Sequence, residues 1–250
     1  MSISTDKKTN YLSTETCLSS KEAYRADYLG LIPYEPALKL QQLLMQARTE
    51  GNIPDTVLLL QHPPVFTVGR FRGEEDIIAA PQVLAQEGIA IFHTNRGGGV
   101  TYHGPGQLVG YPILNLKENR LGVREYIWKL EEVVINLLLT FGIHGYRLAK
   151  HPGSVWADRE KICSIGIYVS RYITMHGFAL NVSTNLRHFE YINPCGIKGA
   201  VMTSISELIG YPVEVKPITE NFLHSFSAIF GLEREQGDVK CLAMPNALSG

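Results

Sequence analysis

The sequence predicts an α+β fold with a largely mixed β-sheet. Strand-like and helix-like segments follow one another in mixed order along the chain. Two apolar runs, 161–169 and 173–182, are separated by a short polar turn and predict a β-hairpin. No internal repeat or clear linker interrupts the chain, so we expect a single domain over residues 21–232. It is flanked by polar tails at 1–20, which is expected to be disordered, and at 233–250.

The first half of the chain is predicted to alternate strands with short helices. Leucines at 3.6-residue spacing form one face of a helix that begins at Pro36 and ends near Gly51. A second, shorter helix is expected over 81–86. Extended apolar runs predict strands at 23–29, 56–60, 65–68, 89–93 and 108–114.

The second half contains the clearest helix, Val123–Phe141. Its apolar residues follow i, i+3, i+4, i+7 spacing throughout, and Gly142 ends it. Ser204 and Glu207 have the spacing of a capping box, which predicts a short helix after Ser204. The remaining elements are strands at 155–157, 161–169 and 173–182 and a final helix at about 219–230.

Composition indicates a globular protein and excludes several functional classes. The chain is 45% hydrophobic and 19% charged with a formal net charge of −1, which gives no basis for a nucleic-acid or membrane partner. No apolar run is long enough to span a bilayer, and the first residues lack the apolar core of a secretory signal. The 4 cysteines include no C-x-x-C pair, which indicates free thiols in a reducing compartment. We therefore expect a cytoplasmic protein.

No motif for a metal or a phosphate-bearing cofactor is present. The 8 histidines include no H-E-x-x-H pair, and no G-x-x-x-x-G-K-[ST] phosphate loop occurs. Gly104 and Gly106 match only part of a dinucleotide fingerprint, which Pro105 interrupts. We expect neither a metal nor a cofactor.

The segment Arg96–Gly110 is the first place to look for a binding site. It reads Arg-Gly-Gly-Gly-Val-Thr-Tyr-His-Gly-Pro-Gly-Gln-Leu-Val-Gly, and its glycines let the backbone turn tightly and approach a ligand closely. We expect a loop held at both ends by strands. A plain surface turn would not need Arg, Thr, Tyr and His among its glycines. His103 could act as a general base, as a positioning donor or as an ordinary loop histidine.

Two cysteines are candidate nucleophiles. Cys195 lies between Pro194, which restricts the local backbone, and Gly196, which leaves space beside the sulfur. Cys163 would share a strand face with Lys161, two residues before it. A lysine ammonium about 4 Å from a thiolate attracts it by roughly 4 kcal/mol at an effective dielectric constant of about 20. Half of that would lower a cysteine pKa from about 8.5 to near 7. Periodicity alone leaves both cysteines open.

Three segments taken together resemble one family. They are Arg96-Gly-Gly-Gly-Val-Thr-Tyr-His-Gly-Pro-Gly-Gln, Lys161-Ile-Cys-Ser-Ile-Gly and Asn193-Pro-Cys-Gly. In this order they are similar to the octanoyltransferases of lipoate biosynthesis, and the resemblance extends over about residues 22–230. It implies a fold like that of biotin and lipoate protein ligases, with helices on one side of a large mixed sheet and a smaller sheet beside it. It also implies a Cys195–Lys161 dyad, since the family has a small residue at the position of Cys163.

The resemblance further implies an acyl transfer. We expect no need for ATP, because a thioester donor is already activated, and we expect a monomer. An octanoyl group would pass from octanoyl acyl carrier protein to Cys195. It would then pass to a lysine of the apo lipoyl domains of 2-oxoacid dehydrogenases or of the glycine cleavage H protein. The substrate-binding residues implied are Arg96, Gly97, Gly98, Gly99, Val100, Thr101, Tyr102, His103, Ser164, Ile165, Gly166, Gly177, Phe178 and Ala179. An apolar channel would be lined by Val100, Tyr102, Ile165 and Phe178, and a basic docking rim formed by Arg70, Arg72, Arg147, Lys150, Arg159 and Arg171.

Two alternatives stay open at this point. An ATP-dependent lipoate–protein or biotin–protein ligase would share the fold, form an acyl-adenylate and need no nucleophilic cysteine. A non-catalytic module for acyl carriers or lipoyl domains would bind its partner without turnover.

Overall fold

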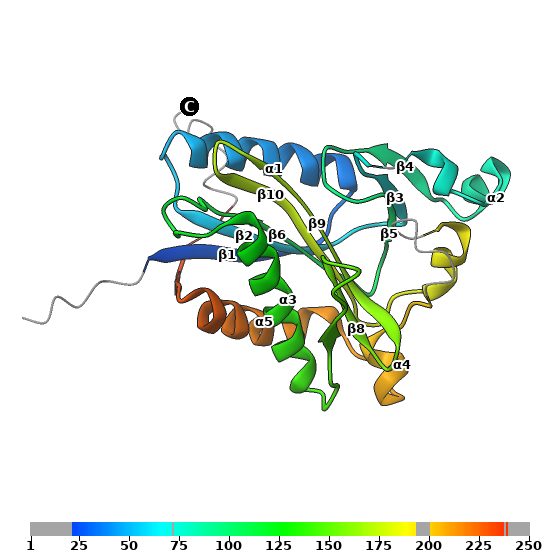
Figure 1. Ribbon diagram of the computed structural model, residues 1–250. Coiled ribbons are helices and arrows are strands. Elements are labelled where there is room, and N and C mark those ends of the chain that lie inside the picture. Colours follow the sequence, from blue (N-terminus) through cyan, green and yellow to red (C-terminus); the bar gives the residue numbers. More distant parts are fainter. Residues whose placement is uncertain (1–21, 72, 194–200, 238, 240–250) are drawn as a thin grey trace, which may run out of the picture.

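Two β-sheets form the framework of the molecule (Figure 1). The structure is a computed structural model that describes residues 22–71, 73–193, 201–237 and 239. Over these residues, the large sheet has 8 strands in the order β11-β1-β2-β6-β10-β9-β8-β7, and the small sheet has 3 in the order β4-β3-β5. The strands are β1 (Ala23–Leu31), β2 (Asp55–Gln61), β3 (Val65–Val68), β4 (Ala90–His93), β5 (Val100–His103), β6 (Gln107–Ile113), β7 (Tyr146–Arg147), β8 (Ser154–Ala157), β9 (Glu160–Ser170), β10 (Ile173–Asn181) and β11 (Glu233–Glu235).

Both sheets are mixed. In the large sheet β1 pairs in parallel with β2 and β11, whereas the neighbours from β2 through β6, β10, β9 and β8 to β7 pair antiparallel. In the small sheet β3 pairs in parallel with β4 and antiparallel with β5. The predicted α+β class with a large mixed sheet and a smaller one is confirmed.

Helices cover both faces of the large sheet. The helices of the described chain are α1 (Tyr34–Thr49), α2 (Pro81–Gln86), α3 (Val123–Leu139), α4 (Ile205–Ile209) and α5 (Val215–Phe230), with 3-10 turns η1 (Glu74–Asp76) and η2 (Leu186–Tyr191). Of these, α2 and η2 pack with the small sheet. Figure 1 shows α1 above the sheet and α3 and α5 below it. The prediction had placed the helices on one side only.

The apolar pattern of β2 explains the two covered faces. Val57 and Leu59 belong to the core between the large sheet and helices α3 and α5. Leu58 and Leu60 belong to the core between the sheet and α1. Successive strand residues point to opposite faces, so an uninterrupted apolar run requires cover on both. Full burial stabilises each such side chain by about 1.5–3 kcal/mol.

Most predicted elements occur within two residues of their expected ends. The hairpin turns at Arg171–Tyr172, where both residues have positive φ, and Ser204 caps α4 by accepting the Glu207 N–H. Helix α5 begins at Val215, earlier than predicted, because Pro217 in its first turn needs no intrahelical N–H bond. The N-terminal tail 1–20 lies outside the described residues.

Three strands were missed by sequence reasoning. The first is β7, which has only two residues and pairs with β8. Strand β11 has only exposed, charged residues and is held through its backbone to β1, so no apolar pattern marks it in the segment predicted as a C-terminal tail. Strand β5 lies inside the glycine-rich segment that was predicted as a loop, and it pairs with β3 over its whole length.

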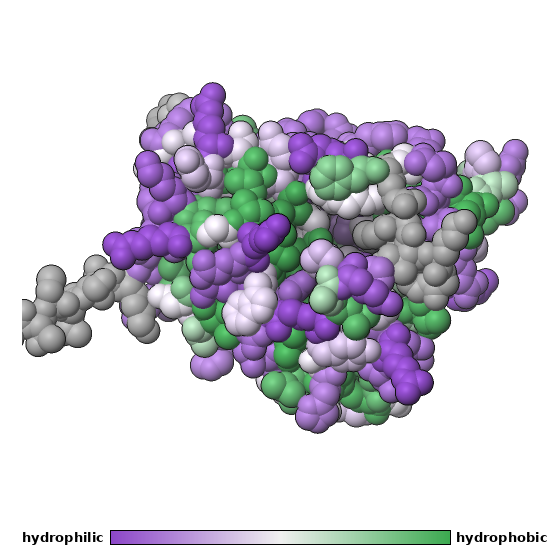
Figure 2. Space-filling model, in the orientation of Figure 1, coloured by the Kyte–Doolittle hydropathy of each residue, from purple (hydrophilic) through white to green (hydrophobic). Residues whose placement is uncertain are grey.

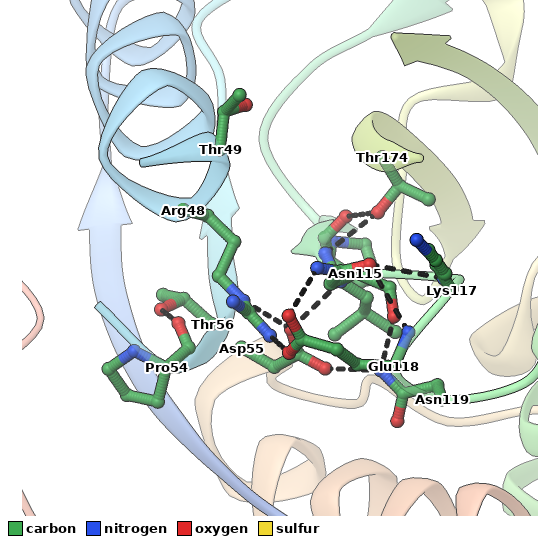
Figure 3. A network of polar contacts seen from close by, with 12 residues as sticks. Arg48, Thr49, Pro54, Asp55, Thr56, Asn115, Lys117, Glu118, Asn119 and Thr174 are labelled. Carbon is green, nitrogen blue, oxygen red and sulfur yellow. Dashed lines mark hydrogen bonds and ion pairs between the residues drawn. The ribbon is translucent and has the colours of Figure 1, made fainter. Parts of the chain in front are cut away.

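A polar network fastens the C-terminal end of α1 to the sheet (Figure 3). The Arg48 Nε donates to Asp55 Oδ1 at 2.8 Å, and the same guanidinium pairs with Glu118. Asp55 also accepts from the Asn115 N–H at 2.9 Å and from Asn119. The network secures α1 at the end opposite Tyr34, which lines the cavity described next.

Among the helices in the described ranges, none combines the length and the apolar character needed to cross a lipid bilayer.

Candidate active site

A cavity opens where the small sheet meets β9 and β10 of the large sheet. It encloses about 450 Å³ of empty space, part of it open to solvent. In the space-filling view the surface is hollowed at this junction (Figure 2). The predicted substrate-binding residues that line it are Arg96, Gly97, Gly98, Thr101, His103, Ser164, Ile165, Gly166, Gly177, Phe178 and Ala179. Three segments far apart in the sequence are therefore brought to one cavity.

Val100, Tyr102 and Gly99 are not among the lining residues. Alternation along β5 sends Thr101 and His103 towards the cavity and Val100 and Tyr102 to the opposite face. There Val100 and Tyr102 are fully buried in a separate apolar cluster on the far side of the small sheet. The prediction that these two side chains line an acyl channel is wrong, because the segment is a strand and not a loop.

Sequence reasoning missed three residues that line the cavity: Tyr34, Tyr111 and His176. Tyr34 begins α1 and stacks on the His103 ring, with ring centroids 6.3 Å apart. His176 has a φ of 58°, unusual for a residue other than glycine, and its Nε2–H donates to Asn95 Oδ1 at 2.7 Å. Of the three, His176 could have been found from the sequence. It lies two residues before Phe178 in the predicted strand 173–182, and residues two apart in a strand share a face.

Burial keeps the histidines around the cavity uncharged. It lowers the pKa of His176 to about 3 and that of the neighbouring His62 to about 4. Burial also lowers the pKa of His103 well below its usual value, and the nearby His62 adds to the effect. None of these rings therefore carries a charge at neutral pH, and among the lining residues the charged group is the Arg96 guanidinium. The rest of the wall suits an apolar acyl chain.

The Arg96 guanidinium ties the glycine-rich segment to the small sheet. It is 6% exposed, and it donates to both the carbonyl and the hydroxyl oxygen of Thr67 and to the Gly97 carbonyl. Gly166 of β9 packs against this segment so closely that a Cβ there would lie 2.9 Å from the Gly97 carbonyl oxygen. The glycines let the two backbones approach each other, which shapes the cavity wall.

Gly177 is required for the pairing of β10 with β6. A Cβ at this position would lie 2.2 Å from the Gly110 carbonyl oxygen and 2.7 Å from Cδ of Pro112. We expect Gly177→Ala to lower the free energy of unfolding by about 1–3 kcal/mol, measured by urea denaturation. The control is Gly122→Ala, where a Cβ meets nothing within 4 Å. Equal losses in the two variants would contradict the prediction.

Lys161 is buried on the same strand that supplies Ser164, Ile165 and Gly166 to the cavity. It is 2% exposed. Its N–H donates to the Val201 carbonyl at 2.9 Å, and its carbonyl accepts from the Thr203 N–H at 3.0 Å. Three residues along a strand span roughly 10 Å, so Lys161 lies within about that distance of Ser164 along β9.

Cys195 and its neighbours Pro194 and Gly196 lie outside the described residues. The chain on either side of them is well anchored. Before them, the Asn193 N–H donates to the Asp76 carbonyl at 2.7 Å. After them, Val201 pairs with Lys161.

Cys163, the other candidate nucleophile, is fully buried in the core between the large sheet and helices α3 and α5. Burial raises the pKa of its thiol to about 12, although the charge of Lys161 opposes the rise. A thiol that is protonated at neutral pH and has no exposed surface cannot attack a thioester on a partner protein. The structure therefore argues against Cys163 as the nucleophile.

Not every arginine of the predicted basic docking rim has a charge that could attract an acidic partner. Arg70 lies over the rings of Phe71 and Tyr168, and Phe71 is close to Gly97 at the cavity. Arg147, in contrast, is paired with Glu131 and Glu132, which offset its charge. Arg72 lies outside the described residues.

Comparison with known proteins assigns the chain to a family. Residues 33–227 match the model of the lipoyl protein ligase A/B catalytic domain. Over 206 residues the chain is 47% identical to the octanoyltransferase of Alkaliphilus metalliredigens, an alignment that covers 82% of this chain and 94% of that protein. The chain belongs to the octanoyltransferase family. Members of this family are enzymes, so the expected octanoyltransferase activity is confirmed. The alternative of a non-catalytic binding module is rejected.

Solved structures of low sequence identity share the fold. The bi-partite lipoate protein ligase of Thermoplasma acidophilum superposes with a TM-score of 0.68 at 14% identity, covering 90% of this chain and 91% of that one. The biotin protein ligase of Aquifex aeolicus in complex with biotin and ATP gives 0.50 at 16% identity, covering 83% and 70%. These likenesses confirm the predicted fold relation. At such identity they carry no argument for ATP-dependent ligation.

Proposed function

We propose that the chain transfers an octanoyl group from octanoyl acyl carrier protein to a lysine of apo lipoyl domains through an acyl-enzyme on Cys195. The acceptors are the lipoyl domains of 2-oxoacid dehydrogenases and the glycine cleavage H protein, and the enzyme acts as a cytoplasmic monomer without a cofactor. The observation that carries the proposal is the buried Lys161, which shares β9 with three residues that line the cavity. Its backbone also pairs with Val201, a few residues after Cys195.

In the first step the Cys195 thiolate attacks the thioester carbon of the donor. A carbon–sulfur bond to Cys195 forms, the bond to the carrier sulfur breaks, and the carrier thiolate takes a proton from the Lys161 ammonium. The octanoyl chain lies in the cavity along β9 and the glycine-rich segment, where Ile165 and Phe178 supply apolar contacts.

In the second step the uncharged amine of the acceptor lysine attacks the acyl-enzyme. The amide bond forms, the Cys195 thiolate leaves, and neutral Lys161 accepts the proton that the amine loses. Lys161 thus returns to its ammonium form beside a thiolate, and no ATP is consumed because the thioester is already activated.

The proposal predicts an isolable acyl-enzyme. Incubation with octanoyl acyl carrier protein in the absence of ATP is expected to raise the intact mass of the protein by one octanoyl group, carried on Cys195. Cys195→Ala should abolish the adduct, whereas Cys163→Ala should retain it because the Cys163 thiol is buried in the core. An adduct that needs ATP, or one lost equally in both variants, would sink the proposal.

A further inference from the structure

A continuous series of buried side-chain hydrogen bonds crosses from the small sheet to the strand of Lys161. Thr67 Oγ1 lies 3.3 Å from His103 Nε2, and His103 Nδ1 lies 2.8 Å from Gln107 Oε1. Gln107 Nε2 lies 2.9 Å from Asn181 Oδ1, and Asn181 Nδ2 lies 2.9 Å from the Thr203 carbonyl oxygen. All five residues are at most 6% exposed. They belong to strands β3, β5, β6 and β10 and to the segment before α4.

The direction of every bond in the series is determined by backbone carbonyls, which can only accept. Gln107 Nε2 also lies 3.1 Å from the Tyr102 carbonyl, so it is the amide nitrogen, and Asn181 Nδ2 is identified in the same way by Thr203. Gln107 Oε1 must then accept from the His103 Nδ1–H. This leaves Nε2 of the neutral ring as an acceptor for the Thr67 hydroxyl.

The two ends of the series lie at different parts of the proposed active site. At one end Thr67 Oγ1 accepts from Arg96 Nη2 at 2.8 Å, and both Arg96 and His103 line the cavity. At the other end the Thr203 N–H donates to the Lys161 carbonyl at 3.0 Å. The acyl cavity and the backbone of the buried lysine are thus connected through Gln107 and Asn181.

We infer that Gln107 and Asn181 are positioning residues for the transfer reaction. Through their hydrogen bonds they fix the position of His103 in the cavity wall relative to Lys161 and to the segment that begins at Val201. Neither side chain lines the cavity, so they act through the groups that they orient. The inference rests on the proposed function, in which Lys161 exchanges protons with the reacting groups and must therefore be held in place.

His103 has a defined role in this series. Its Nδ1–H is donated to Gln107 and its Nε2 accepts from Thr67, so neither nitrogen is left to accept a substrate proton. Burial lowers its pKa well below the ordinary value and keeps the ring in the neutral form that the series requires. Of the three roles considered for His103, the geometry favours that of a positioning donor.

The test uses Gln107→Met and Asn181→Ala in the full-length enzyme. The matched control is Asn119→Ala, which removes a side-chain amide that donates to Asp55 and to the Asn115 carbonyl in the network at the far end of α1. For each variant we would measure thermal unfolding, the rate of octanoyl adduct formation, and the pH dependence of iodoacetamide alkylation at Cys195. The last readout reports the thiol pKa, which a purely structural loss would leave unchanged.

We expect the two variants to form the adduct on the order of 100-fold more slowly than the wild type, as displacement of a catalytic group by about 1 Å does. Their alkylation profiles should move to higher pH, since Lys161 no longer lies in its place. Asn119→Ala should lose thermal stability and keep both the rate and the profile. Wild-type rates and profiles in Gln107→Met and Asn181→Ala, whatever their stability, would overturn the inference. A wild-type enzyme that forms no adduct would refute the proposed function, and the inference with it.

A measurement on the wild type tests the series without relying on the variants folding. The ¹⁵N–¹H spectrum of His103, assigned by its loss in His103→Gln, is expected to show the neutral Nδ1–H tautomer throughout pH 6 to 8. An Nε2–H tautomer, or a charged ring in that range, would contradict the bond directions and overturn the inference.

Discussion

Lys161→Met is expected to slow octanoyl adduct formation on Cys195 by on the order of 10³-fold. A lysine charge about 4 Å from a thiolate is worth roughly 4 kcal/mol at an effective dielectric constant of about 20. Losing half of it raises the thiol pKa by about 1.5 units and lowers the thiolate fraction at pH 7 roughly tenfold. Loss of the proton donor for the carrier thiolate accounts for another factor of about 10². Methionine keeps the buried stem packed, so the protein should remain folded.

Single-turnover mass measurements and the pH profile of alkylation check this prediction. A matched control is Lys129→Met, which removes a lysine that donates to the Ile229 carbonyl and lies over Phe230. Lys129→Met should keep the wild-type rate and profile. If Lys161→Met also kept them, Lys161 would have no part in the reaction.

The protein is expected to lose much of its stability between pH 6.5 and pH 4. The pKa of His62 falls to about 4 and that of His176 to about 3 on folding, whereas the unfolded chain binds these protons near pH 6.5. Below that value the unfolded state holds more protons, so the free energy of unfolding falls as the pH falls. At pH 5 each buried histidine costs about 2 kcal/mol. His103 adds a third contribution of the same sign.

Urea denaturation at a series of pH values measures this loss. In His62→Gln, the amide can donate to the Ile32 carbonyl or accept from the Tyr111 hydroxyl, the two partners of the His62 ring. The free energy of unfolding of this variant should fall less steeply between pH 6.5 and 4. The slope should correspond to one proton fewer taken up on unfolding. His144→Gln, at an exposed position, should retain the wild-type slope. Identical slopes in all three proteins would show that His62 is not held neutral by burial.

Much of the fold was accessible from local patterns. The long helix α3 and the hairpin of β9 and β10 were predicted nearly to the residue, because apolar spacing and a polar turn are local properties. Strand β11 was not, since its charged residues bury nothing and its position depends on a partner strand, β1, that lies far away in the sequence.

The site was predicted in its segments but not in all its side chains. The glycines of Arg96–Gly110 and the family resemblance of the strand that begins at Lys161 led to two segments that meet at the cavity. Tyr34 and Tyr111 were missed because each is an ordinary apolar position in its own element and reaches the cavity only through packing. Val100 and Tyr102 were misplaced because the direction of a side chain depends on whether its backbone is strand or loop.

The class of fold, the family resemblance and the residues proposed for the chemistry were all available from the amino-acid sequence, since they depend on residue type and order. The face that each side chain occupies depends on how the elements pack in three dimensions. This packing buried the Cys163 thiol in the core, neutralised three histidines beside the cavity, and joined His103 to the strand of Lys161 through Gln107 and Asn181. Burial and hydrogen-bond partners arise from contacts between distant segments, and these contacts change the pKa values and tautomers on which the chemistry depends.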